Sequence, residues 1–233
     1  MKTKKNFFQV LALQFLIWGA QAQEVGQSPW GPEDEIGSLN MMTDSSRIQI
    51  LSQIGSGQVY DLSVDYFVGM PSFHSLGDPS YQYWLTHTPH GTVVDNPNGM
   101  GEAMNEKVSY TGDAVSMYTH MGTHIDALNH FGLNGLIWNG FSPEEHLGDK
   151  GWKKTGAEKI PPIIARGLLL DVRALVDSFP PNYRITIQDL KACLKRQKTE
   201  IQKGDVILIR TGQAQHYEDA AHYLHQYPGI SLA

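Results

Sequence analysis

The stretch His120-Met-Gly-Thr-His-Ile-Asp-Ala-Leu-Asn-His130 places three histidines and one aspartate within eleven residues. Imidazole nitrogen and carboxylate oxygen together suit zinc, manganese or iron. On a helix, Asp126 would point almost opposite to His124, whereas in an extended chain His120, His124 and Asp126 would point the same way. We therefore predict a divalent metal site, Zn²⁺ or Mn²⁺, with these three side chains as ligands on a strand end or a tight loop.

Two residues inside the stretch support this prediction. Gly122 and the β-branched Thr123 both disfavour a helix, and Gly122 also permits an unusual φ between two ligands. His130 follows close enough to reach an open coordination position. The alternative is a set of ordinary histidines, since the chain has 10 of them, but the density of this arrangement favours a metal site.

The sequence on either side of the stretch mixes strand and helix signals. Alternation or short apolar runs predict strands at residues 57–64, 113–120, 166–171 and 204–210. Helical spacing predicts amphipathic helices at residues 43–54 and 186–196. Their inward-facing residues are Ile48, Leu51 and Ile54 in the first helix and Ile187, Leu190 and Leu194 in the second. The fold class is therefore α/β or α+β.

Residues 70–105 are rich in Gly, Pro, His and aromatic residues, which predicts a long functional loop. Tyr83 and Trp84 are candidates for an aromatic wall against a flat substrate, and His90 is a candidate substrate contact. Core packing is the alternative for the aromatic residues, because it accounts for most of them in proteins.

Composition limits the class of ligand. The chain has 233 residues, 41% of them hydrophobic, which is ordinary globular material. The formal net charge is −6, which disfavours nucleic acid, whose binding needs clustered Lys and Arg. The expected partner is a small-molecule substrate. The single cysteine, Cys193, allows no intramolecular disulfide and is interpreted as a buried structural thiol.

The N-terminal segment predicts export. A basic start, Met1-Lys-Thr-Lys-Lys5, precedes an apolar stretch and the A-x-A site Ala20-Gln-Ala22. A membrane anchor is the alternative, but the apolar stretch is shorter than the about 20 residues that span a bilayer. We expect residues 1–22 to be a signal peptide and the mature protein, without a membrane segment, to be periplasmic or secreted.

The stretch from His120 to His130 resembles the H-x-G-T-H-x-D-x-x-x-H signature of the cyclase family, which includes bacterial kynurenine formamidase (arylformamidase) and isatin hydrolase. Three other segments agree with the resemblance: Trp30-Gly-Pro-Glu-Asp-Glu-Ile-Gly-Ser-Leu-Asn40, Arg166-Gly-Leu-Leu-Leu-Asp171 and Gly204-Asp-Val-Ile-Leu-Ile-Arg-Thr-Gly212. The resemblance implies a swivelling β/β/α fold with mixed sheets flanked by helices over residues 23–233. It also implies a dimer or tetramer.

The resemblance also implies roles for the motif. His120, His124 and Asp126 match the family's metal ligands, and His130 matches its general acid/base. The implied activity is hydrolysis of an amide, formamide or lactam bond in a small aromatic substrate, as in tryptophan catabolism to kynurenine. Lactonase or cyclase-type chemistry on the same site is one alternative. Family members continue with a His and a Glu that help bind a second metal, so a missing C-terminal part is expected here. An inactive remnant or an exported small-molecule binder is the second alternative.

Overall fold

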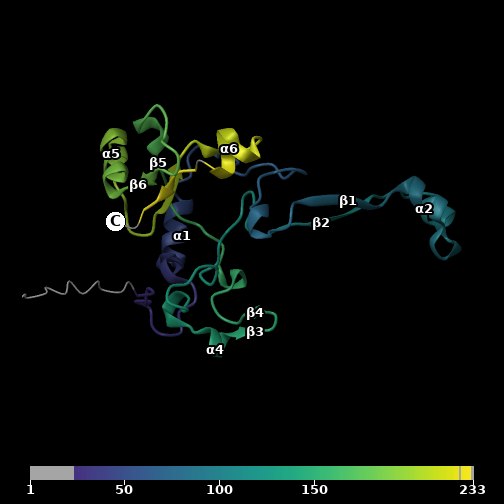
Figure 1. Cartoon of the computed structure of the whole chain (residues 1–233), viewed down its shortest axis with the longest axis horizontal. Helices are drawn as coiled ribbons and strands as arrows, with labels where there is room; N and C mark the ends of the chain where they lie inside the picture. Colours follow the sequence, from purple (N-terminus) through teal and green to yellow (C-terminus); the bar gives the residue numbers. More distant parts are fainter. Residues whose placement is uncertain (1–23, 226, 232–233) are drawn as a thin grey trace, which may run out of the picture.

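The computed structural model describes residues 24–225 and 227–231 (Figure 1). The expected signal peptide, residues 1–22, lies outside the described residues. Among the residues that are described, no helix is long and apolar enough to cross a membrane.

The described part of the chain alternates short helices with short strands. The α-helices are α1 (Asp44–Leu51), α2 (Pro89–Asp95), α3 (Gly101–Asn105), α4 (Pro143–His146), α5 (Ile187–Gln197) and α6 (Ala220–His225). The strands are β1 (Gln82–His87), β2 (Gly112–Ser116), β3 (Leu147–Gly148), β4 (Gly151–Trp152), β5 (Gly167–Asp171), β6 (Arg184–Ile185), β7 (Val206–Arg210) and β8 (Gly229–Ile230). Single 3-10 turns span Gly37–Met41, His74–Leu76, Pro97–Gly99, Trp138–Gly140, Ala157–Lys159, Val172–Leu175 and Gln213–His216.

The strands form both parallel and antiparallel pairs. β5 pairs with β7 and β6 with β8 in parallel, while β1 pairs with β2 and β3 with β4 in the antiparallel sense. Helix α5 lies beside the β5–β7 pair (Figure 1). The mixed α/β class expected from the sequence is therefore confirmed.

The main hydrophobic core surrounds strand β5. Leu168 and Leu170 point inward from this strand, and Leu170 is fully buried together with Cys193 of α5. Thr186 and Asp189 form a capping box that starts α5 at the expected position. Burial raises the pKa of the Cys193 thiol, which agrees with its interpretation as a structural thiol. Ile187 departs from the expectation, since it is exposed at the first turn of the helix.

The N-terminal half departs from the sequence expectations at two places. Helix α1 begins after Thr43, whose side chain caps it through Ser46, but Ile48, Leu51 and Ile54 are exposed rather than buried. Residues 57–64 alternate like a strand but form no ladder, so that prediction is wrong. Alternation describes a possible strand face, and a strand also needs a partner for its backbone hydrogen bonds.

Residues 82–116 form a projecting arm, whereas residues 70–81 are irregular apart from the 3-10 turn His74–Leu76. β1 and β2 pair as a hairpin that extends from the body, and α2 lies at its far end (Figure 1). Every residue of β1 is exposed, including Tyr83 and Trp84. The expected loop is therefore irregular only over residues 70–81, and its functional role stays a prediction.

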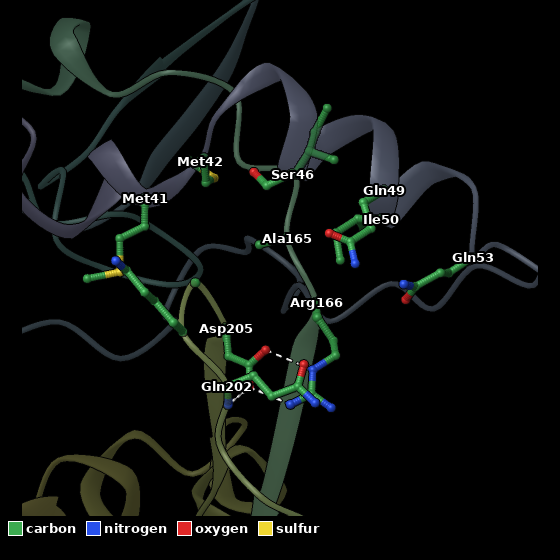
Figure 2. Close-up of a pocket in the computed structure, with 13 residues that line it drawn as sticks. Met41, Met42, Ser46, Gln49, Ile50, Gln53, Ala165, Arg166, Gln202 and Asp205 are labelled. Carbon is green, nitrogen blue, oxygen red and sulfur yellow. Dashed lines mark hydrogen bonds and ion pairs between the residues drawn. The ribbon is translucent and has the colours of Figure 1, made fainter.

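An ion pair joins the two parallel core strands near their starts. Arg166 precedes β5, and its guanidinium donates to both carboxylate oxygens of Asp205, which precedes β7, at 2.8 and 2.6 Å. Figure 2 shows this pair at one end of a small cavity of about 120 Å³ that α1 closes on the other side. Asp205 also accepts the backbone N–H of Gln202 at 2.7 Å.

These contacts predict a pH-dependent stability. The hydrogen bond from Arg166 is the largest influence on the pKa of Asp205 and lowers it despite the opposing effect of burial. A lowered folded-state pKa stabilises the fold above the unfolded value of about 3.9, and this contribution is lost as pH falls through the folded-state pKa. We expect Asp205→Asn to be less stable than the unaltered protein near neutral pH. The difference should shrink progressively below about pH 4.

Urea unfolding midpoints measured across this pH range test the expectation. Asp44→Asn is the matched control, because Asp44 pairs with Arg47 on the surface of α1, where its side chain is 97% exposed. A constant difference between Asp205→Asn and the unaltered protein at all pH values would contradict the assignment.

Candidate metal centre

The candidate metal centre lies in a turn that follows strand β2. Residues 119–123 form turns and bends, and Gly122 has a φ of +62°. The backbone therefore reverses between His120 and His124 instead of running extended, as the sequence argument assumed. The three candidate ligands still converge, because the turn folds His124 and Asp126 back toward His120.

Contacts from residues 64–70 hold this turn in place. The Tyr66 hydroxyl donates to the backbone oxygens of Met121 and Thr123, at 3.2 and 2.5 Å. The Thr123 hydroxyl oxygen accepts the backbone N–H of Val64 at 2.8 Å. Met121 is also buried, with 3% of its surface exposed, so packing as well as hydrogen bonds holds the turn in place.

Gly122→Ala is expected to destabilise the protein and to weaken metal binding. A Cβ at Gly122 would lie 2.7 Å from Cζ of Tyr66 and 3.0 Å from Cε of Met70. The left-handed backbone alone costs an L-residue about 1–2 kcal/mol. Displacing the Tyr66 ring would add to this cost and would break the hydrogen bonds that hold the turn.

Gly57→Ala is the matched control for this substitution. Gly57 has a φ of +64°, but no atom lies within 4 Å of the position that a Cβ would occupy, so Gly57→Ala bears the backbone cost without the collision. Thermal unfolding and metal titration of both variants separate the two effects. Equal loss of stability in the two variants would show that the packing of Tyr66 against Gly122 is unimportant.

The candidate ligand atoms face one another across the turn. His120 Nδ1 lies 2.6 Å from Oδ1 of Asp126, and His124 Nε2 lies 3.2 Å from the same oxygen. One ligand atom from each of the three residues falls within 4.8 Å of the others. His124 Nδ1 contacts the backbone oxygen of Gly122 at 3.0 Å, which favours a proton on Nδ1 and leaves the Nε2 lone pair for a metal.

Electrostatics keep the Asp126 carboxylate ionised. Burial acts to raise the pKa of Asp126, but the hydrogen bond with His120 and the charges that His124 and His130 carry when protonated lower it below its usual value. A carboxylate ligand must be deprotonated, so a lowered pKa suits coordination, and His124 loses its own proton from Nε2 when it binds the ion. Two imidazoles and one carboxylate also leave an open position on a four-coordinate ion, as a catalytic site requires. The donor set therefore fits a divalent ion such as Zn²⁺ or Mn²⁺.

His130 lies against the cluster without joining it. Its ring stacks on His120 with centroids 3.6 Å apart and an interplanar angle of 14°, and Phe131 packs on its edge at 4.5 Å. No hydrogen bond to its ring nitrogens occurs among the described residues. A half-buried imidazole with free nitrogens next to a metal ligand is placed to carry a proton, and the general acid/base role of His130 stays a prediction.

The three residues predicted to contact a substrate lie outside the cluster of candidate metal ligands. Tyr83 and Trp84 are on β1, and the Tyr83 hydroxyl donates to Asp113 on the paired strand. His90 is exposed on α2, at the far end of the arm (Figure 1). The structure does not bring these residues together with His120 and His124, and their contact with a substrate stays a prediction.

A cavity of about 330 Å³ adjoins the cluster instead. His120, Gly122 and His124 form one side of it, and Phe73 and Tyr227 lie in an edge-to-face arrangement with centroids 6.4 Å apart. Its polar lining includes Thr211 and Gln213, and Tyr223 and Leu224 of α6 complete the apolar part. The sequence analysis singled out neither these residues nor the segment around α6. No local pattern distinguishes it, because the cavity depends on contacts between distant segments.

Comparison with protein families settles the relationship. The model of the family described as "Putative cyclase" matches residues 60–233, which include the whole metal-site turn and the cavity beside it. The chain belongs to the cyclase family. A search among curated proteins finds no match.

Two solved structures show the same fold. A structure titled as a novel cyclase is 25% identical, with a TM-score of 0.75 over 90% of this chain and 71% of its own length. Isatin hydrolase A from Ralstonia solanacearum is 20% identical, with a TM-score of 0.50 over 75% of this chain and 59% of its own length. The mixed α/β architecture described above is therefore that of the cyclase family.

Proposed function

We propose that this cyclase-family protein is a metal-dependent hydrolase that cleaves an amide, formamide or lactam bond in a small aromatic substrate. The observation that carries the proposal is the convergence of His120, His124 and Asp126 within 4.8 Å beside a cavity of about 330 Å³. The fold similarity to an isatin hydrolase supports the same class of reaction. Within this class we favour an arylformamidase of the kynurenine formamidase type, acting on a formyl group attached to an aromatic amine.

The chemistry that this site needs divides between a metal and the protein. A bound divalent ion supplies Lewis acidity for the substrate carbonyl and lowers the pKa of water from 15.7 to about 7. His120, His124 and Asp126 would hold that ion. His130 would accept the proton of the attacking water and return it to the leaving nitrogen. Its ring stacks on the candidate ligand His120, which places it beside the metal site.

The walls of the cavity suit a flat ring. The Phe73 and Tyr227 rings meet edge to face, and an aromatic substrate packed against either ring would gain the favourable geometry of aromatic pairs. Gln213 donates its amide N–H to the Tyr223 backbone oxygen at 2.9 Å, so its own oxygen is held in place as an acceptor at the cavity wall. A formamide N–H is the kind of donor that such an acceptor would bind.

A panel of substrates tests the proposal. The full chain is loaded with Zn²⁺ or Mn²⁺, its metal content is measured, and it is incubated with N-formylkynurenine, formanilide, isatin and an aryl lactone. Hydrolysis of at least one amide-type substrate, absent after chelation and restored by metal, is the expected result. Turnover of the lactone alone would replace amide hydrolysis with lactonase chemistry. A metal-loaded protein that hydrolyses none of them would overturn the proposal.

A further inference from the structure

A second cavity lies next to the one beside the metal cluster. It measures about 350 Å³ and shares Thr211, Gln213 and Pro228 with its neighbour, so the two meet along these residues. The remaining lining is given by Arg173, Ser178, Phe179, Gly212, Gln215, His216 and His222. Among the described residues no acidic side chain lines this cavity, whereas one arginine and two histidines do.

Arg173 has no charged partner among the described residues. Its guanidinium donates to the backbone oxygen of Val176, and no carboxylate lies within ion-pair distance. Asp171, two positions earlier, is paired with Arg210 at 2.9 Å and so is already neutralised. A half-buried guanidinium with a single backbone acceptor leaves most of its five N–H donors without a protein partner.

Packing fixes where this guanidinium lies. The Cγ and Cδ atoms of Arg173 rest 3.0 Å from the position that a Cβ on Gly212 would occupy. Gly212 has a φ of +81° and immediately follows Thr211, one of the residues shared by the two cavities. The aliphatic part of Arg173 therefore lies over the glycine, and this contact holds the residue at the cavity wall.

His216 and His222 supply further donors in the same cavity. Their ring centroids are 3.9 Å apart with an interplanar angle of 30°, so the two imidazoles form one surface. A neutral imidazole carries one N–H donor, and a protonated one carries two. Phe179 contributes an apolar wall and is itself stacked on Tyr183 at 4.9 Å.

We propose that this second cavity is a carboxylate-binding subsite in which Arg173 is the main partner of the anion. A planar guanidinium binds a carboxylate through two parallel hydrogen bonds, and the histidines would add donors. Its part in selecting substrates rests on the proposed function. A substrate whose reactive carbonyl lies beside His120 and His124 would extend a carboxylate past Thr211 to Arg173.

Binding of a matched pair of probes tests the subsite without any turnover. Phenylbutyrate and phenylbutyramide share one skeleton, and only the first is an anion. We expect the full chain, with its metal bound, to bind phenylbutyrate at least about tenfold more tightly by calorimetry, the effect of a charge-assisted hydrogen bond. Equal affinity for the two probes would overturn the proposal.

Substitutions locate the preference. Arg173→Met keeps the aliphatic packing on Gly212 and removes the charge, so it should abolish the preference for the anion, while Arg173→Lys should restore part of it. Arg47→Gln, on the surface of α1, is the control and should change nothing. If Arg173→Met keeps the preference while His124→Ala loses it, the carboxylate binds at the metal cluster and the subsite is wrong. Should Arg173→Met fail to fold, full preference in a folded Arg173→Gln variant would refute the proposal in the same way.

Kinetics separate this proposal from the function on which it rests. N-formylkynurenine and its methyl ester carry the same formamide, and only the free acid has a carboxylate. A lower KM for the acid, lost in Arg173→Met, supports the subsite as part of substrate selection. If neither compound is hydrolysed but the probes still distinguish Arg173, the hydrolase proposal fails and the anion site stands. If both are hydrolysed with one KM and the probes bind equally, the anion site fails alone.

Discussion

His130→Ala is expected to lower turnover by about 10²–10⁴-fold while the protein still binds its metal, because positioned acid/base catalysis contributes this much. The structure separates His130 from the three candidate ligands: its ring stacks flat on His120, and it is not among the atoms that converge within 4.8 Å. A stacked ring can support a ligand without donating to the metal. Turnover is therefore measured at saturating metal, on whichever substrate of the panel is hydrolysed.

His146→Ala is the matched control for this prediction. Like His130, His146 is half-buried and packs against a phenylalanine edge, in this case Phe141 at 5.1 Å, but it lies on α4 outside the cluster. Its removal should leave turnover within a few-fold of the unaltered protein. If His130→Ala binds metal as poorly as a ligand variant does, His130 is itself a ligand. If its turnover equals that of His146→Ala, the acid/base role is wrong.

Local signals in the sequence predicted the parts of the fold that depend on local contacts. Thr186 and Asp189 are three residues apart and cap α5 through each other, so the start of that helix follows from its own residues. The parallel strands β5 and β7 were equally clear from their apolar runs, although no residue of β7 is fully buried. Residues 57–64 show the limit of such local signals, because their alternation is strand-like but they pair with no strand in the described part of the chain.

The candidate metal centre was predictable for a different reason. Its ligands lie within seven residues, so a single turn is enough to bring them together. The predicted backbone path was nevertheless wrong in detail, since Gly122 at φ +62° makes a turn where an extended segment was expected. The spacing of the motif predicted which residues meet. The backbone conformation between them depends on Tyr66, which is distant in sequence, and so it could not be predicted locally.

The cavities could not be predicted from the sequence. Phe73 and Tyr227 are far apart in the sequence, and neither has a neighbour that marks it as a cavity residue. The same holds for Arg173, whose significance depends on Asp171 being paired with Arg210 across the β5–β7 sheet. Tyr83 and Trp84 have the composition of a substrate wall, but the hairpin carries them onto the arm.

His124→Ala is expected to reduce metal affinity by more than the about 10–100-fold that loss of a supporting partner costs, because it removes a coordinating atom. The Nε2 atom of His124 lies 3.2 Å from Oδ1 of Asp126, and the contact between its Nδ1 and the Gly122 carbonyl leaves that Nε2 free to coordinate. Without this ring, His120 and Asp126 remain as two donors, too few for a stable tetrahedral site. Competition with a chromophoric chelator, with Zn²⁺ or Mn²⁺, measures the affinity.

Tyr66→Phe gives this prediction a graded comparison within the same turn. It removes the hydroxyl that donates to the Met121 and Thr123 carbonyls but leaves every candidate ligand in place. Its loss of affinity should stay within about 10–100-fold, as for other supporting partners, and should therefore fall between that of His146→Ala and that of His124→Ala. If Tyr66→Phe loses as much affinity as His124→Ala, the turn conformation and not the imidazole determines binding. If His124→Ala retains the affinity of the unaltered protein, the metal binds elsewhere and the His120, His124 and Asp126 cluster is not the metal centre.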